Sequence, residues 1–409
     1  MTAESPTRAE PLAARRAAAA EQDRVQHMRR RVEALLGIPA TEGNALTVLR
    51  NGDRIFPAML EAIRGATQTI DFLTFVYWKG DIAQEFARAL AERAAAGLRV
   101  RVLIDAIGGR LIDRGLLDHM AASGVHVEWF RSPFTLAQIT SPLKQNHRTH
   151  RKVLICDERI GFTGGVGIAE EWCGDARDET EWRDTHVRVE GPAVDGLAAS
   201  FAQNWAETGQ PLLDDRDTFP EHGRPGDSVV QVVRGSAGPG WNDMATVFRV
   251  MIESAQARLR MMTAYFVPDD CFQQLLLDAV ARGVQVDVML PGPYADKRVC
   301  QLASESLYAG LVDGGVRIWA FQPSMLHAKV MTVDGLASVV GSANMNRRSM
   351  QLDEEVVLSV LDPDVTRQLE DDFDAELPRC ERISPRRWKD RPLHQKAQEK
   401  ATTVIHRFL

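Results

Sequence analysis

Two short segments of the chain contain the same pattern of reactive side chains. The first reads HRKVLICD and the second HAKVMTVD, so each has His-x-Lys and, after four more residues, an Asp. The six residues are His150, Lys152 and Asp157 in the first segment and His327, Lys329 and Asp334 in the second. With ten histidines and eight lysines among 409 residues, two such matches are far from a chance result. The pattern therefore predicts a functional site.

The spacing places the histidine and the lysine on the same side of a strand. Side chains alternate along a strand, so His150 and Lys152 share one face, while Asp157, at an odd offset of seven, points to the other. A lysine ammonium attracts a phosphate, and an imidazole beside it can attack phosphorus or transfer a proton. Each pair therefore predicts chemistry on a phosphate group, with the Asp as a buried supporting residue rather than a general base.

Each motif is followed by residues that can complete such a site. Fourteen residues after each histidine comes a turn of small residues. These turns are Gly164-Gly165 in the first copy and Gly341-Ser342 in the second. A neutral histidine nucleophile also needs a carboxylate or carbonyl that holds its other ring nitrogen. About thirty residues downstream, Asp184 and either Glu354 or Glu355 are candidates, and the two glutamates are not distinguished by the sequence.

Metal and cofactor chemistry is not expected. The lysine of each motif would repel a cation bound by the neighbouring histidine. Five scattered cysteines without a CxxC pair indicate neither a zinc site nor a disulfide framework.

The two motifs lie in a duplicated series of elements. Each half has an apolar strand, an amphipathic helix and a second strand, followed by another helix, a short strand and the motif strand. The first three segments are 69–78, 82–97 and 98–105 in the first half and 259–267, 271–283 and 284–290 in the second. Strands that alternate with helices of this length predict βαβ units with helices on both faces of a sheet. The expected fold is thus two repeated α/β/α units.

The composition shifts along the chain predict five regions. They are an Ala/Arg-rich helical extension at 1–44, a first domain at 45–210, a Pro-, Gly- and Asp-rich linker at 211–228, a second domain at 229–377 and a tail at 378–409. The first copy also has an insertion at 131–148, which is a candidate lid or substrate loop.

The charge is distributed unevenly. The formal net charge of -7 combines a basic segment at 379–409 with a strongly acidic remainder, which disfavours a nucleic-acid partner. No apolar run is long enough for a membrane span or a signal peptide, so we expect a cytoplasmic protein. Residues 388–409 have apolar side chains at near-helical spacing among basic ones. This tail either lies on an anionic membrane or packs on the protein's own body.

At the doubled motif the sequence resembles the phospholipase D superfamily, and it is most similar to the soluble bacterial cardiolipin synthase branch. The segments that carry the resemblance are YFVPD (265–269), MLHAKVMTVD (325–334), GSANMNRRS (341–349) and WRDTHVRVEGP (182–192). The resemblance implies that the two halves pack about a pseudo-twofold axis and share one active site. It further implies a phosphatidyltransferase that works through a phosphohistidine without a metal, on a phosphatidylglycerol-like substrate. The expected location is the cytoplasm, in peripheral association with the inner face of the cell membrane.

The resemblance also implies roles for individual residues. The His, Lys and Asp of both motifs would form the catalytic set, with His150 as nucleophile and His327 as acid in our working hypothesis. The phosphate and the imidazoles would be held or oriented by Asn344, Ser342, Gly164, Gly165, Asp184 and Glu355. Two positions depart from the family pattern: Gly167 stands where Asn is usual, and Asp353 stands where another Asn is usual. Hydrolysis to phosphatidic acid, a phospholipase D-like nuclease and a non-catalytic lipid-binding scaffold remain alternatives.

Overall fold

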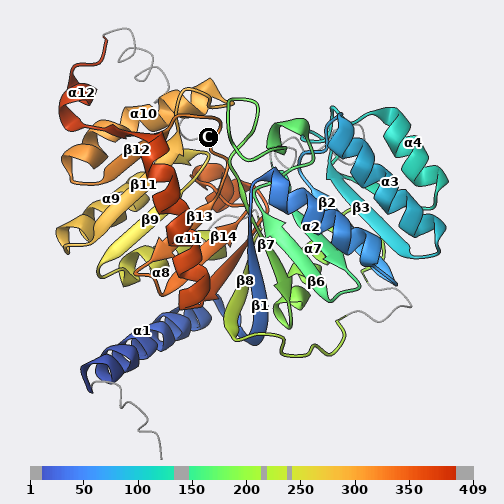
Figure 1. Cartoon of the computed structure of the whole chain (residues 1–409), viewed down its shortest axis with the longest axis horizontal. Helices are drawn as coiled ribbons and strands as arrows, with labels where there is room; N and C mark the ends of the chain where they lie inside the picture. The colour runs from blue at the N-terminus through green and yellow to red at the C-terminus, as the bar shows by residue number, and fades with distance from the viewer. Residues whose placement is uncertain (1–11, 133–146, 213–218, 237–241, 393–409) are drawn as a thin grey trace, which may run out of the picture.

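The computed structural model describes residues 12–132, 147–212, 219–236 and 242–392. Figure 1 shows two halves side by side, joined where β1 and β8 lie next to each other. The first half is blue to green and the second yellow to red, except that the blue helix α1 lies beside the second half. The elements of the first half are α1 (Leu12–Leu36), β1 (Thr41–Arg50), α2 (Gly52–Gly65), β2 (Thr69–Thr74), α3 (Asp81–Ala95), β3 (Arg99–Asp105), α4 (Arg114–Ala122), β4 (His126–Phe130), β5 (Val153–Cys156), β6 (Ile160–Gly164), η1 (Glu170–Trp172), β7 (Thr185–Glu190) and α7 (Ala193–Ala206). Those of the second half are β8 (Ser228–Gly235), α8 (Asp243–Ser254), β9 (Arg258–Met262), β10 (Phe266–Val267), α9 (Asp270–Ala281), β11 (Gln285–Pro291), α10 (Arg298–Asp313), β12 (Arg317–Phe321), β13 (Val330–Val333), β14 (Ala337–Gly341), β15 (Met345–Asn346), η2 (Arg348–Leu352), β16 (Glu355–Leu361), α11 (Pro363–Glu376), η3 (Leu377–Arg379), β17 (Cys380–Ile383) and α12 (Pro385–Lys389).

The strand order is symmetric about the centre of the molecule. The described residues form a 15-stranded sheet in the order β17-β12-β11-β9-β13-β14-β16-β8-β1-β7-β6-β5-β2-β3-β4. Outward from the β8–β1 pair, each strand of one half has a counterpart in the other, and β17 is the extra strand at one edge. The duplicated α/β architecture expected from the sequence is confirmed.

Local sequence determines where these elements begin and end. The strands β2, β3 and β11 are almost wholly buried because helices cover both faces of the sheet, which suits their apolar residues. Asp side chains cap three helices by accepting backbone N–H bonds: Asp113 at α4, Asp269 at α9 and Asp362 at α11. The predicted N-terminal helix corresponds to α1, which packs on α8 through buried Met28 and Val32.

The strands of the structure do not begin at the predicted boundaries between regions. The strand β1 begins at Thr41, before the predicted start of the first domain, and β8 begins at the last linker residue, Ser228. The start of the predicted tail forms β17, which pairs with β12 and so supplies that edge strand with backbone partners. Most of the insertion at 131–148 and residues 393–409 of the tail lie outside the described residues.

At Trp388 the structure favours the second of the two alternatives for the tail, packing on the protein's own body. Only 9% of this residue is exposed, and its ring packs against Tyr308 with centroids 5.0 Å apart. It packs there because α10 offers an apolar surface beside it. Within the described ranges, no helix is both long and apolar enough to cross a bilayer.

Candidate active site

His150 and Lys152 lie in extended chain directly before β5, and their second-half counterparts lie directly before β13. The two histidines are thus found in the residues that lead into the motif strands, and not within those strands as the alternation pattern predicts. The strand β5 runs antiparallel to β2, with Val153 opposite Leu73, so the His-x-Lys pair lies at the carboxyl end of β2. In the second half β13 pairs with β9 in the same way.

The Asp of each motif lies at the opposite end of its strand. Asp157 accepts backbone N–H bonds from residues 67–69, and Asp334 does the same with residues 256–258. Both have a positive φ of 54°, at the turn that follows the strand. The structure therefore does not bring Asp157 and Asp334 to the histidines. They anchor the start of β2 and β9 instead, which is a structural role away from the reacting groups.

Each histidine is held by a carboxylate from the other half of the chain. His150 Nδ1 lies 3.0 Å from Glu355 Oε1, and His327 Nδ1 lies 2.8 Å from Asp184 Oδ2. A carboxylate accepts hydrogen bonds, so each ring carries its proton on Nδ1 and has an unprotonated Nε2, and in the second half Lys329 Nζ lies 3.2 Å from His327 Nε2. Neither half can form a complete His–carboxylate pair alone.

The backbones cross over in the same reciprocal way. The His150 N–H donates to the Glu354 carbonyl at 2.8 Å, and the His327 N–H donates to the Arg183 carbonyl at 2.7 Å. These bonds place each histidine beside the residue that precedes its carboxylate partner. The two half-sites thus form one site at the interface of the halves.

Glu355, rather than Glu354, is the partner of His150. Glu354 is directed to Asn204 and Arg131, away from the imidazole. The structure thereby settles a choice that the sequence left open, because adjacent residues point to opposite sides of the chain.

The small-residue turns support the two carboxylates by different means. Ser342 Oγ donates to Glu355. A Cβ at the corresponding residue, Gly165, would lie 2.1 Å from Asp184 Oδ1, so the absence of a side chain makes room for this carboxylate. At Gly164 a Cβ would meet the Thr185 carbonyl at 2.4 Å. These three residues shape the carboxylate pockets.

Both lysines are buried beside their histidines. Lys152 Nζ donates to the His150 carbonyl at 2.7 Å, and Lys329 Nζ lies 3.0 Å from His327 Nδ1 and also donates to that residue's carbonyl. Burial lowers the pKa of Lys152 to about 7 and that of Lys329 to about 8, although Glu355 and Asp184 oppose the shifts. Two cations held without their usual hydration form an anion-binding site.

Burial also changes the pKa values of the two carboxylates and the two imidazoles. The pKa of Glu355 rises to about 7 because the carboxylate is buried, with Lys152 opposing the rise, and burial also raises the pKa of Asp184. The pKa values of His150 and His327 lie well below their usual value because of burial and then of the neighbouring lysine charges. Lysines of both halves act on both imidazoles, so the four side chains share one electrostatic environment.

Asn344 belongs to the second half-site only. It is buried, and its Oδ1 accepts the Tyr265 N–H at 3.3 Å. The corresponding residue, Gly167, packs so that an added Cβ would lie 2.6 Å from Val76 Cβ. The site therefore has a polar amide on one side and close backbone packing on the other.

The model of the family described as "Cardiolipin synthase, PLD-like domain" matches residues 59–205 and 248–377. The chain belongs to this family. It is 33% identical to cardiolipin synthase A of Pseudomonas fluorescens over 85% of this chain and 71% of that protein. It is 34% identical to cardiolipin synthase A of Pseudomonas syringae pv. syringae over 90% of this chain and 75% of that protein.

Solved structures share the fold. The phosphatidylserine synthase of Haemophilus influenzae matches with a TM-score of 0.72 and 16% identity, over 94% of this chain and 100% of that one. A polyphosphate kinase of Porphyromonas gingivalis matches with a TM-score of 0.56 and 15% identity, over 90% of this chain and 53% of that one.

The structure adds site residues that sequence reasoning missed. Trp172 Nε1 donates to Asp184 at 2.8 Å, and Ser349 Oγ donates to Glu355 at 2.6 Å. Each stands 22 residues after its motif histidine, so an alignment of the two copies could have paired them. The Phe75 ring contacts His150 at 5.2 Å between centroids, and no repeat signal marks this residue.

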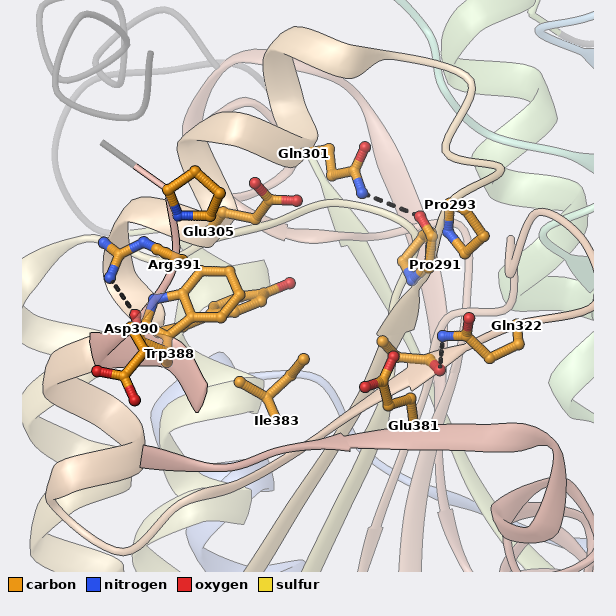
Figure 2. Close-up of a pocket in the computed structure, with 14 residues that line it drawn as sticks. Pro291, Pro293, Gln301, Glu305, Gln322, Glu381, Ile383, Trp388, Asp390 and Arg391 are labelled. Carbon is orange, nitrogen blue, oxygen red and sulfur yellow. Dashed lines mark hydrogen bonds between the residues drawn. The ribbon is translucent and has the colours of Figure 1, made fainter. Parts of the chain in front are cut away.

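An open pocket of about 630 Å³ lies elsewhere, against α10, β17 and α12, and contains neither histidine. Figure 2 shows Trp388 and Arg391 at one end of it and Pro291 and Gln322 at the other. This pocket is therefore separate from the paired histidines.

Proposed function

We propose that this protein is a phospholipase D-type phosphatidyltransferase that makes cardiolipin from phosphatidylglycerol. The observation that carries the proposal is the reciprocal pairing of His150 with Glu355 and of His327 with Asp184. Two histidines with unprotonated Nε2 atoms beside two buried lysines suit a two-step transfer of a phosphodiester group.

In the first step His150 Nε2 attacks the phosphorus of the lipid. The bond from phosphorus to the headgroup oxygen breaks, and the leaving glycerol takes a proton from His327. The product left on the protein is a phosphatidyl-histidine. The negative phosphodiester raises the pKa of His327 and of the lysines when it binds, so their protonated forms are available in the complex.

In the second step His327 accepts the proton of a hydroxyl group on a second phosphatidylglycerol. That oxygen attacks phosphorus, and the bond to His150 breaks. Cardiolipin leaves and the original protonation states return. By the family resemblance, Lys152, Lys329 and Asn344 hold the phosphate oxygens during both steps, while Ser342 supports Glu355.

Water in place of the second lipid would give phosphatidic acid, the product of the hydrolytic alternative. The curated cardiolipin synthases that the chain matches favour transfer. The acidic composition outside the tail disfavours the nuclease alternative.

Incubation of the purified protein with phosphatidylglycerol vesicles tests the proposal. The lipids are identified by mass, with the His150→Ala protein as control. We expect cardiolipin and free glycerol in equal amounts. Phosphatidic acid as the main product would show that the protein hydrolyses the lipid and does not transfer it. The absence of any lipid product would overturn the lipid function.

We further propose peripheral contact with the anionic inner face of the cell membrane. Two observations support it: the substrate class is lipid, and the segment 379–409 is basic on an otherwise acidic chain. Removal of residues 393–409 is expected to weaken co-sedimentation with phosphatidylglycerol vesicles at low salt, and unchanged co-sedimentation would contradict a role for these residues.

A further inference from the structure

Two loops occupy corresponding positions in the two halves. Residues 106–113 connect β3 to α4, and residues 292–297 connect β11 to α10. β3 runs parallel to β2, and β11 runs parallel to β9. Both loops therefore begin at the carboxyl ends of these strands, which is the end where the His-x-Lys segments lie. In Figure 1 the helices that follow them, α4 and α10, lie at the upper edge on opposite sides of the midline.

Both loops expose large apolar side chains. Ile107 and Leu111 in the first half are 47% and 49% exposed. Tyr294 and Val299 in the second, the latter in the first turn of α10, are 42% and 47% exposed. Within the described residues, these make up four of the seven large hydrophobic residues that are exposed. Single exposed hydrophobic residues are ordinary, but pairs at corresponding places of a repeat indicate a use.

Basic residues stand among these apolar ones. Arg110 and Arg114 are exposed in the first half, and Lys297 and Arg298 are exposed in the second. The acidic residue of each loop is engaged within the protein. Asp113 caps α4 by accepting the Gly115 N–H, and Asp296 accepts the hydroxyl of Tyr265 at 2.8 Å. Arg298 also lies 3.4 Å from Glu305. Each loop with its flanking residue still has two basic residues against one acidic residue, and a positive excess beside apolar side chains is the composition that binds an anionic bilayer surface.

Each loop contacts a residue of the active site. A Cβ at Gly108 would lie 2.1 Å from the Phe75 carbonyl, so this loop packs closely on the residue whose ring contacts His150. In the second half, Lys297 Nζ lies 4.9 Å from the Tyr265 ring centre, and the Tyr265 backbone binds Asn344. The charge of Lys297 also acts on both imidazoles. The loops therefore border the site from its two sides.

We propose that the β3–α4 and β11–α10 loops together form a bilayer-docking surface that inserts Ile107, Leu111, Tyr294 and Val299 into the interface of an anionic membrane. The inference rests on the proposed lipid function, which it deepens by stating how the shared site is turned toward its substrate. Docking on both sides of the site would let a headgroup enter while the acyl chains stay in the bilayer.

Serine substitutions in the full-length protein test this surface. The test variant is Ile107→Ser, Leu111→Ser, Tyr294→Ser and Val299→Ser combined. The matched control replaces the three other exposed hydrophobic residues by serine: Leu35, Leu212 and Phe219, which are 47%, 55% and 44% exposed. Co-sedimentation is measured with vesicles of equal parts phosphatidylglycerol and phosphatidylcholine, and turnover is measured on dihexanoyl phosphatidylglycerol below its micelle concentration.

We expect the test variant to bind vesicles on the order of tenfold or more weakly, since four inserted side chains are lost. Turnover of the monomeric short-chain lipid stays within twofold of the wild type, which shows that the site is intact. The control variant keeps wild-type binding. Unchanged vesicle binding by the test variant, or an equal loss in the control, would overturn the proposal.

Two further readouts distinguish membrane docking from self-association and from catalysis. If light scattering shows that the test variant has lost an oligomer while its vesicle binding is unchanged, the loops contact a second copy of the chain and the docking proposal is wrong. If the wild type binds vesicles through these loops but converts no lipid, the proposed function fails while the docking surface stands.

Discussion

The two half-sites have the same plan but different surroundings. The side chain of His150 is 12% exposed, next to Phe75, and its carboxylate partner accepts hydrogen bonds from Ser342 and Ser349. The side chain of His327 is 6% exposed and lies against the two rings of Trp172 and Trp182. A duplicated unit has thus kept its reactive groups while the residues around them have changed.

The different surroundings suit the two copies of the repeat to two different chemical roles. A more accessible imidazole with a hydroxyl-supported carboxylate suits attack on an incoming phosphodiester. An imidazole held between aromatic rings and Asp184 suits proton transfer at a fixed place. We therefore propose His150 as the nucleophile and His327 as the acid, and the predictions below test this proposal.

The largest expected effect is loss of either histidine. His150→Ala and His327→Ala should each reduce lipid turnover about a thousandfold or more, because each fills a separate role in one cycle. A p-nitrophenyl phosphodiester distinguishes them, since its leaving group needs no proton. His327→Ala should still release a burst of p-nitrophenol and His150→Ala should release none; the opposite result would exchange the two roles.

Substitution of each carboxylate should impair the same step as loss of the histidine that it holds. Glu355→Gln and Asp184→Asn should each lower kcat on lipid about a hundredfold, because the imidazole loses the charge that fixes its tautomer. On the p-nitrophenyl substrate, only Glu355→Gln should lower the burst rate. If only Asp184→Asn slowed the burst, the roles proposed for His150 with Glu355 and for His327 with Asp184 would be wrong. Glu354→Gln serves as the control, since its side chain is directed away from His150.

The pH dependence should be bell-shaped and narrow. As pH falls below about 7, Glu355 gains a proton and releases its hold on His150, so kcat/KM falls. As pH rises through about 7 to 8, Lys152 and then Lys329 lose their charge in the free enzyme, so phosphate binding weakens. Each limb should approach about tenfold per pH unit. Rates on monomeric short-chain lipid measure this, and a flat profile from pH 5 to 9 would contradict these shifts.

The smallest effects should come from the two corresponding turn residues. Ser342→Ala removes the hydrogen bond that the hydroxyl donates to Glu355 and the one that it accepts from the Val356 N–H, so kcat should fall about fivefold and stability by about 1 kcal/mol. Gly165→Ala places a methyl group against Asp184 and should destabilise the fold by about 1–3 kcal/mol. Thermal unfolding and kinetics of the two variants give the comparison. Equal destabilisation would mean that Gly165 does not make room for the carboxylate.

The sequence alone determined the repeated unit and the reactive residues. The pattern of strands and helices recurs in the chain, and the His-x-Lys spacing can be read from neighbouring residues, so both are local properties. The α/β fold followed from the repeat, and the family resemblance carried by the motifs implied the pseudo-twofold plan. Local spacing also predicted that the Asp of each motif is no general base, although its place at the far strand end depended on the antiparallel pairing of β5 with β2.

Only the tertiary structure decided which carboxylate serves which histidine. His150 and Glu355 are 205 residues apart, and His327 and Asp184 are 143 apart, so no local spacing could pair them. The choice of Glu355 over Glu354 depends on which face of one strand meets the other half. The same applies to Trp388 and to the two exposed loops, because burial is a property of the packed chain and not of the residue type.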